Sequence, residues 1–172
     1  MPARYLTDHM RVVIQFAFAT LLFFFPAHLA ATATPQSAPN ISINGSFVPD
    51  KVPRGSTVKG TVVMDIPSGF HTHSNRPLEK FLIGTELKIE APRGISVGPT
   101  MYPRPLLRSL KFSKSKVSVF EGRTTMRFNV RIPANYSEKS AEIRGRLRYQ
   151  SCNDDTCFPP QTREVKMWLQ IQ

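Results

Sequence analysis

The sequence predicts an all-β domain, and three observations lead to this fold class. Apolar and polar residues alternate along several short runs, turn-forming residues separate these runs, and no long helical pattern interrupts them. The composition, 41% hydrophobic with 15 prolines, is also typical of strands joined by turns. About 140 residues remain once the N-terminal segment is set aside, which is enough for one domain with a real core. At least seven short strands in that length predict an immunoglobulin-like β-sandwich of antiparallel strands.

The N-terminal segment has the pattern of a secretory signal. Arg4 and Arg11 precede an apolar run over residues 12–25, and Pro26 and small residues follow it. The run is shorter than the roughly 20 residues of a membrane span. We therefore expect residues 1–33 to be a cleaved signal peptide, with an uncleaved anchor as the alternative. Residues 34–40 are expected to be a linker, and 41–172 the domain, in an oxidising space outside the cytoplasm.

Seven runs in the domain have the period-two alternation of a strand that is buried on one face. In residues 123–132, for example, Met126, Phe128 and Val130 alternate with polar side chains. Turn signals such as Pro67-Ser-Gly69 and Glu121-Gly122 separate the runs. The expected strands are 41–48, 57–66, 85–90, 116–120, 123–132, 142–150 and 164–171.

Residues 98–115 break the alternation. Three prolines and a cluster of arginines and lysines, with leucines and Phe112 among them, predict a long basic loop. Long loops in compact domains often carry function, but they can also be ordinary connections whose apolar residues cover an edge of the sandwich.

The formal net charge of +11 leaves nucleic acid, an anionic membrane surface or an acidic protein as partner classes. No recognition-helix pattern and no aromatic-basic RNA motif is found, so we expect no nucleic-acid partner. Association with an anionic membrane surface stays open, and a solvated basic face is the simpler interpretation.

Only two cysteines occur, Cys152 and Cys157, and four turn formers, Asn153-Asp-Asp-Thr156, separate them. Strand-like runs enter and leave this segment, which predicts a β-hairpin with a cysteine on each side of the turn. Facing residues of an antiparallel pair are close enough for a disulfide. Such a short loop would add only roughly 2 kcal/mol to stability in the chain-entropy model, so a purely structural bridge would contribute little.

Strand parity predicts that Cys152 points outward. If Leu147 and Tyr149 face the core, Gln150 and Cys152 face solvent unless a bulge intervenes. Exposed disulfides are the exchangeable ones. However, no lysine or histidine adjoins the pair in sequence, and Asp154 would raise the pKa of a nearby thiol. From the residues alone, a redox pair and a structural bridge are about equally favoured.

Metal binding is a third interpretation. His71-Thr-His73 places two imidazoles on one face of a strand, and Cys152, Cys157, Met64 and Met101 could add soft ligands. The spacing matches no zinc motif, and a His-x-His pair on a strand is more often two exposed polar residues. We therefore expect no metal and no cofactor.

Several segments in order resemble the "disulfide bond corrector" family, the periplasmic N-terminal domain of the transmembrane thiol:disulfide interchange protein DsbD. The most specific is Tyr149-Gln-x-Cys152…Cys157-x-Pro-Pro160. The others are residues 69–77 (Gly-Phe-His-Thr-His-Ser-Asn-Arg-Pro), 81–85 (Phe-Leu-Ile-Gly-Thr), 91–94 (Ala-Pro-Arg-Gly) and 119–122 (Val-Phe-Glu-Gly).

The resemblance implies an immunoglobulin-like sandwich that relays electrons in the periplasm. It implies that Cys152 and Cys157 are the redox pair, with Cys157 forming the mixed disulfide. It also implies a pocket around the pair to which Tyr149, His71 and His73 belong, and a cap loop whose shielding aromatic would be Phe112. The implied partners are thioredoxin-fold periplasmic proteins and a membrane-embedded thiol electron donor.

The chain departs from the family pattern in two ways. It ends at Gln172 without the family's transmembrane and thioredoxin-like domains, so we expect the donor to act in trans. The acidic residues of the family's cap loop are not evident here. Two alternatives therefore stay beside the relay: a non-catalytic interaction domain with a structural disulfide, and a periplasmic copper-handling protein.

Overall fold

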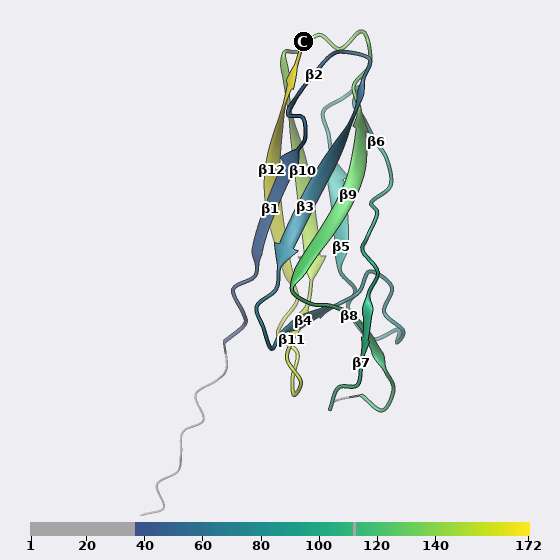
Figure 1. Cartoon of the computed structure of the whole chain (residues 1–172), viewed down its shortest axis with the longest axis vertical. Helices are drawn as coiled ribbons and strands as arrows, with labels where there is room; N and C mark the ends of the chain where they lie inside the picture. Colours follow the sequence, from purple (N-terminus) through teal and green to yellow (C-terminus); the bar gives the residue numbers. More distant parts are fainter. Residues whose placement is uncertain (1–36, 112) are drawn as a thin grey trace, which may run out of the picture. The chain divides into compact units, whose positions relative to one another are not determined.

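The computed structural model describes residues 37–111 and 113–172, and every regular element in these ranges is a β-strand (Figure 1). Within these residues, no helix is long and apolar enough to cross a membrane. The expected signal segment lies outside the described residues. The strands are β1 (Ser42–Phe47), β2 (Lys51–Val52), β3 (Thr57–Asp65), β4 (His71–His73), β5 (Glu86–Glu90), β6 (Ser96–Val97), β7 (Leu106–Arg108), β8 (Val117–Phe120), β9 (Arg123–Arg131), β10 (Ser140–Tyr149), β11 (Ser151–Cys152) and β12 (Gln161–Ile171).

Two four-stranded sheets form an immunoglobulin-like sandwich, which confirms the predicted fold class. One has the order β1-β3-β9-β6 and the other the order β2-β12-β10-β5. All neighbours are antiparallel except β2 and β12, which run parallel. The seven expected runs all contain strands, and their ends agree within a few residues.

The core of the sandwich is made by the alternating apolar side chains of the long strands. Along β10, the residues Ile143, Leu147 and Tyr149 are buried, while the arginines between them are exposed. Strands β3, β9 and β12 show the same alternation, so each long strand buries one face against the opposite sheet.

A third, smaller sheet with the order β11-β4-β8-β7 lies at the end of the sandwich away from the C-terminus (Figure 1). Unlike the long strands, β4, β8 and β11 are buried along their whole length. Three strands of this sheet, β4, β7 and β11, are only two or three residues long, so they had no detectable alternation. This sheet holds Cys152, in β11, and both histidines of interest, in β4.

The expectation of a long basic loop over residues 98–115 is wrong in part. Met101 forms an isolated bridge with Arg127 of β9, and Leu106–Arg108 forms β7 against β8. Phe112 lies outside the described residues, so its expected shielding role stays a prediction.

Candidate functional site: a disulfide beside two buried histidines

The two cysteines form a disulfide across the tip of the hairpin between β10 and β12. Their Cα atoms are 4.0 Å apart, and the two residues make an isolated antiparallel bridge. The turn between them is closed by Asn153, whose side-chain oxygen accepts hydrogen bonds from the backbone N–H groups of Asp155 (3.0 Å) and Thr156 (2.8 Å). The predicted hairpin is thus present, and an asparagine side chain holds its turn.

The two sulfur-bearing residues differ in exposure. Cys152 is fully buried (0% exposed), whereas Cys157 is partly exposed. The parity prediction for Cys152 was therefore wrong. After Gln150 the chain leaves the β10 sheet, and β11 pairs with β4 of the small sheet instead. The alternation of faces holds only within one sheet, so it does not extend across this change.

His73 is a titratable partner of the pair. Its ring is fully buried, with Nε2 3.8 Å from Cys152 Sγ and Nδ1 3.1 Å from the backbone oxygen of Ile83. A carbonyl oxygen can only accept, so we assign the proton of the neutral ring to Nδ1. The Nε2 lone pair then faces Cys152 and can accept a proton from its thiol in the reduced protein.

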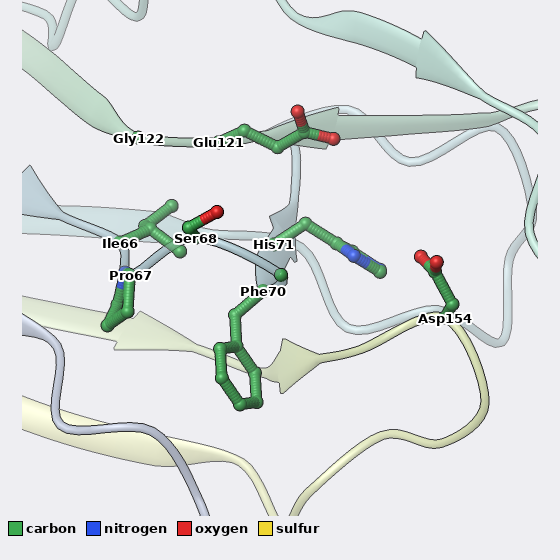
Figure 2. A pocket seen from close by; sticks show the side chains of 9 residues that line it. Ile66, Pro67, Ser68, Phe70, His71, Glu121, Gly122 and Asp154 are labelled. Carbon is green, nitrogen blue, oxygen red and sulfur yellow. The ribbon is translucent and has the colours of Figure 1, made fainter.

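His71 stands opposite Cys152 in the β4–β11 pairing and is also buried. It lines an open pocket of about 460 Å³, together with Phe70, Glu121 and Asp154. Figure 2 shows its imidazole extending toward the carboxylate of Asp154, with Glu121 nearby, directly after β8. The expectation that the His-x-His pair is exposed was therefore wrong for both residues.

Burial lowers the pKa of both histidines. For His71, desolvation is the main cause; the charge of His73 lowers the pKa further, and Glu121 and Asp154 oppose the change. For His73, desolvation also dominates, and the hydrogen bond to Ile83 partly offsets it. Both rings are therefore held in the neutral form, which can accept protons or bind metals.

Two buried aromatic residues, Tyr149 and Phe158, stand close in sequence to the cysteines. Tyr149 is buried, and its hydroxyl donates a 3.0 Å hydrogen bond to the side-chain oxygen of Gln161. Desolvation raises the pKa of this phenol. Phe158, directly after Cys157, is buried and lies 6.1 Å from Phe70, centroid to centroid. Tyr149 belongs to the hydrophobic core of the sandwich.

Two ion pairs connect the segment around β7 to the site. Lys111 Nζ lies 2.8 Å from a carboxylate oxygen of Asp155 in the turn between the cysteines. Arg108 donates two hydrogen bonds of 2.7 Å to the carboxylate of Glu121, which borders the His71 pocket. The residue next to Phe112 therefore contacts the disulfide turn.

His71, His73 and Cys152 also form a compact group of potential metal ligands. Each contributes one ligand atom, and these atoms all lie within 4.8 Å of one another. The thioethers proposed from the sequence are placed elsewhere in the fold. Met64 packs in the core of the sandwich, and Met101 is exposed in its bridge to Arg127.

Sequence reasoning grouped the histidines with Cys152, but it missed the strand pairing that joins them, the hydrogen bond to Ile83 and the Lys111–Asp155 contact. His73 and Cys152 are 79 positions apart, and no local pattern connects them. One usable signal was present: two histidines at alternate positions, with Phe70 and Thr72 beside them, shortly after the turn at Gly69.

A protein-family model matches most of the chain. Residues 45–168 match the family model described as "Thiol:disulfide interchange protein DsbD, N-terminal". No curated protein matches the chain in sequence.

Solved structures were also compared. The N-terminal domain of DsbD from Neisseria meningitidis, in the reduced form, is 16% identical with a TM-score of 0.43, over 66% of this chain and 82% of that one. The N-terminal periplasmic domain of ScsB from Proteus mirabilis is 12% identical with a TM-score of 0.48, over 73% of this chain. The match covers only 44% of the ScsB chain. The match to the family model, rather than these similarities, carries the assignment.

Proposed function

This chain belongs to the family of the N-terminal domain of the thiol:disulfide interchange protein DsbD, and from that premise we propose that it is a periplasmic thiol–disulfide exchange protein. The family and the cysteine pair support thiol–disulfide exchange in general. The finer proposal is that Cys152 and Cys157 relay electrons between a membrane-embedded thiol donor and thioredoxin-fold clients.

One observation carries this proposal: the disulfide has one accessible and one buried sulfur-bearing residue, with a neutral histidine beside the buried one. Exchange requires an incoming thiolate to reach one sulfur, and the other sulfur to leave. The partial exposure of Cys157 makes it the sulfur that a partner can attack. The burial of Cys152 keeps it as the leaving and resolving sulfur.

In the reductive half-reaction, the donor thiolate attacks Sγ of Cys157 and forms a mixed disulfide. The electron pair of the Cys152–Cys157 bond leaves on Cys152 as a thiolate, which takes up a proton. The second thiolate of the donor then attacks its own sulfur in the mixed disulfide and releases the Cys157 thiolate. The donor ends as a disulfide and the domain as a dithiol.

In the oxidative half-reaction, the Cys157 thiolate attacks a client disulfide, and the client's other sulfur leaves as a thiolate. Cys152 must then attack Cys157 to release the client. A thiol at Cys152 needs to lose its proton first, and Nε2 of His73 is positioned to accept it. The domain returns to its disulfide form, and the client gains two electrons.

The compartment and the domain limits belong to the same proposal. Disulfides persist in oxidising spaces such as the periplasm, which agrees with the signal-like pattern in residues 1–33. We propose residues 41–172 as the exchange domain, in line with the family match over 45–168. Residues 34–40 would then be a linker.

Capture of a mixed disulfide tests the proposal. A Cys152→Ser variant keeps the accessible Cys157 but cannot resolve, so it should accumulate covalent adducts with thioredoxin-fold proteins in periplasmic extracts. The matched Cys157→Ser variant keeps only the buried cysteine and should capture far less. Equal, negligible capture by both variants would count against the relay.

The in vivo redox state of the pair separates the relay from a structural bridge. Acid-quenched thiol alkylation in cells should find part of the protein as a dithiol while the reductive pathway is active. A pair that is always oxidised would favour the non-catalytic interaction domain instead.

A further inference from the structure

Three buried donors of two chemical types converge at the inner side of the disulfide. His71 and His73 each supply an imidazole, and Cys152 supplies a sulfur. They come from neighbouring strands, β4 and β11, which pair with His71 opposite Cys152. Backbone hydrogen bonding therefore holds the three donors together before any ligand arrives.

The spacing suits a first-row metal ion. Metal–nitrogen bonds of ~2.0 Å and metal–sulfur bonds of ~2.3 Å hold the two donors about 3.5–3.8 Å apart at tetrahedral to trigonal angles. Nε2 of His73 and Sγ of Cys152 are 3.8 Å apart, and all three ligand atoms lie within 4.8 Å of one another. A small movement of side chains would complete the site.

The orientation of His73 also fits a ligand. Metal-bound histidines commonly donate their second N–H to a carbonyl or carboxylate, which fixes the ring and directs the other nitrogen at the metal. Nδ1 of His73 lies 3.1 Å from the Ile83 carbonyl oxygen, so Nε2 is the nitrogen that faces Cys152.

The charge of the three ligands favours a monovalent metal ion over a divalent one. Two neutral imidazoles and one thiolate carry a single negative charge, which neutralises a monovalent cation but leaves a divalent one with excess charge in a buried site. Thiolate and imidazole ligands suit Cu⁺ and Zn²⁺ alike. A second thiolate would neutralise Zn²⁺, and only Cys157 can supply one.

We propose that opening the Cys152–Cys157 disulfide creates a Cu⁺ site formed by His71, His73 and Cys152. Two electrons and two protons convert the disulfide to two thiols, and Cu⁺ then displaces the Cys152 proton. The reductant is a dithiol donor in the proposed relay, or a phosphine in vitro. The metal and the disulfide compete for the same sulfur, so Cu⁺ would hold the pair in its reduced form.

The inference does not depend on any exchange partner, because chemical reduction or the Cys157→Ser variant provides the free Cys152. Cu⁺ is titrated anaerobically in competition with bicinchoninate, using phosphine-reduced protein, oxidised protein and the Cys157→Ser variant. We expect the reduced protein and Cys157→Ser each to bind one Cu⁺ per chain. The oxidised protein should bind no Cu⁺ with that affinity.

Variants of the ligands identify the site. His71→Phe and His73→Phe in the Cys157→Ser background should each weaken Cu⁺ binding by roughly 10–100-fold or more. Met101→Leu removes an exposed sulfur outside the group and should leave binding unchanged. Thermal melts of the apo proteins identify any variant that fails to fold. In that case, X-ray absorption of the Cu⁺ complex of Cys157→Ser tests the site directly, because it counts the nitrogen and sulfur neighbours of the metal.

A parallel titration with Zn²⁺ shows whether the two metal ions need the same ligands. If Cys157→Ser loses Zn²⁺ but keeps Cu⁺, three ligands suffice for the monovalent ion, as proposed. Equal Cu⁺ binding by oxidised protein, or an absorption spectrum without nitrogen neighbours, would overturn the proposal. Neither result would affect the mixed-disulfide test of the exchange function.

Discussion

Nε2 of His73 lies 3.8 Å from Sγ of Cys152, and the other ring nitrogen is held by the backbone oxygen of Ile83. This relationship places a neutral proton acceptor against the buried half of the disulfide. It also explains how a cysteine with acidic residues nearby in sequence could still resolve a mixed disulfide: the base comes from another strand.

Replacing His73 by phenylalanine should slow the resolving step. Without the acceptor, Cys152 depends on its small intrinsic thiolate fraction at neutral pH, so the rate should fall about tenfold to 100-fold. Quenched-flow mass spectrometry of reduced protein mixed with a small disulfide measures the lifetime of the mixed disulfide. In the variant, the rate should also rise steeply with pH toward the ordinary thiol range. An unchanged lifetime and pH profile would contradict the role of His73.

Replacing Lys111 by methionine should make the disulfide easier to reach. The substitution removes the 2.8 Å ion pair with Asp155 and frees the segment after β7 from the cysteine turn. Because both side chains are exposed, we expect only a few-fold faster reduction by a small thiol. High salt should raise the reduction rate of the wild type toward that of the variant, since salt screens the Lys111–Asp155 ion pair. Lys114→Met, at an exposed lysine of the same segment, is the control and should match the wild type in low salt.

Replacing Asn153 by alanine should shift the pair toward the dithiol. The side-chain oxygen closes the turn with two backbone hydrogen bonds, and this turn keeps Cys157 close to Cys152 in the reduced chain. Losing about 1–2 kcal/mol of turn stability corresponds to a rise in reduction potential of roughly 20–40 mV. Equilibration with glutathione buffers measures it. Asn153→Asp retains an acceptor oxygen and should restore most of the difference; an alanine variant at the wild-type potential would refute the idea.

Acid should weaken the connection between β7 and the site. The hydrogen bonds from Arg108 lower the pKa of Glu121 below its ordinary value. A carboxylate with a lowered folded-state pKa stabilises the fold above its unfolded pKa, and this contribution is lost as the pH falls through the folded pKa. Melting curves from pH 7 to pH 3 should therefore drop more for the wild type than for Glu121→Gln. Parallel curves would show that the pair adds nothing to stability.

The fold could be predicted from the sequence more completely than the site, for physical reasons. The long strands could be predicted because each buries one face, and burial imposes a period of two on residues such as Met126, Phe128 and Val130. The small sheet could not, because β4, β8 and β11 are buried on both faces and three of its strands are too short to show a period. The wrong orientation predicted for Cys152 has a related cause: it lies in β11, which pairs with β4 of the small sheet instead of continuing the β10 sheet.

The sequence by itself determined the all-β class, the hairpin around Cys152 and Cys157, and the family, because alternation and a short motif are local properties of the chain. Only the tertiary structure decided which cysteine is buried and which groups surround it. His71 and His73 reach Cys152 through strand pairing between segments far apart in sequence. Such pairing depends on the burial of the whole sheet, so the residues beside the sulfur cannot be identified from the motif that contains it.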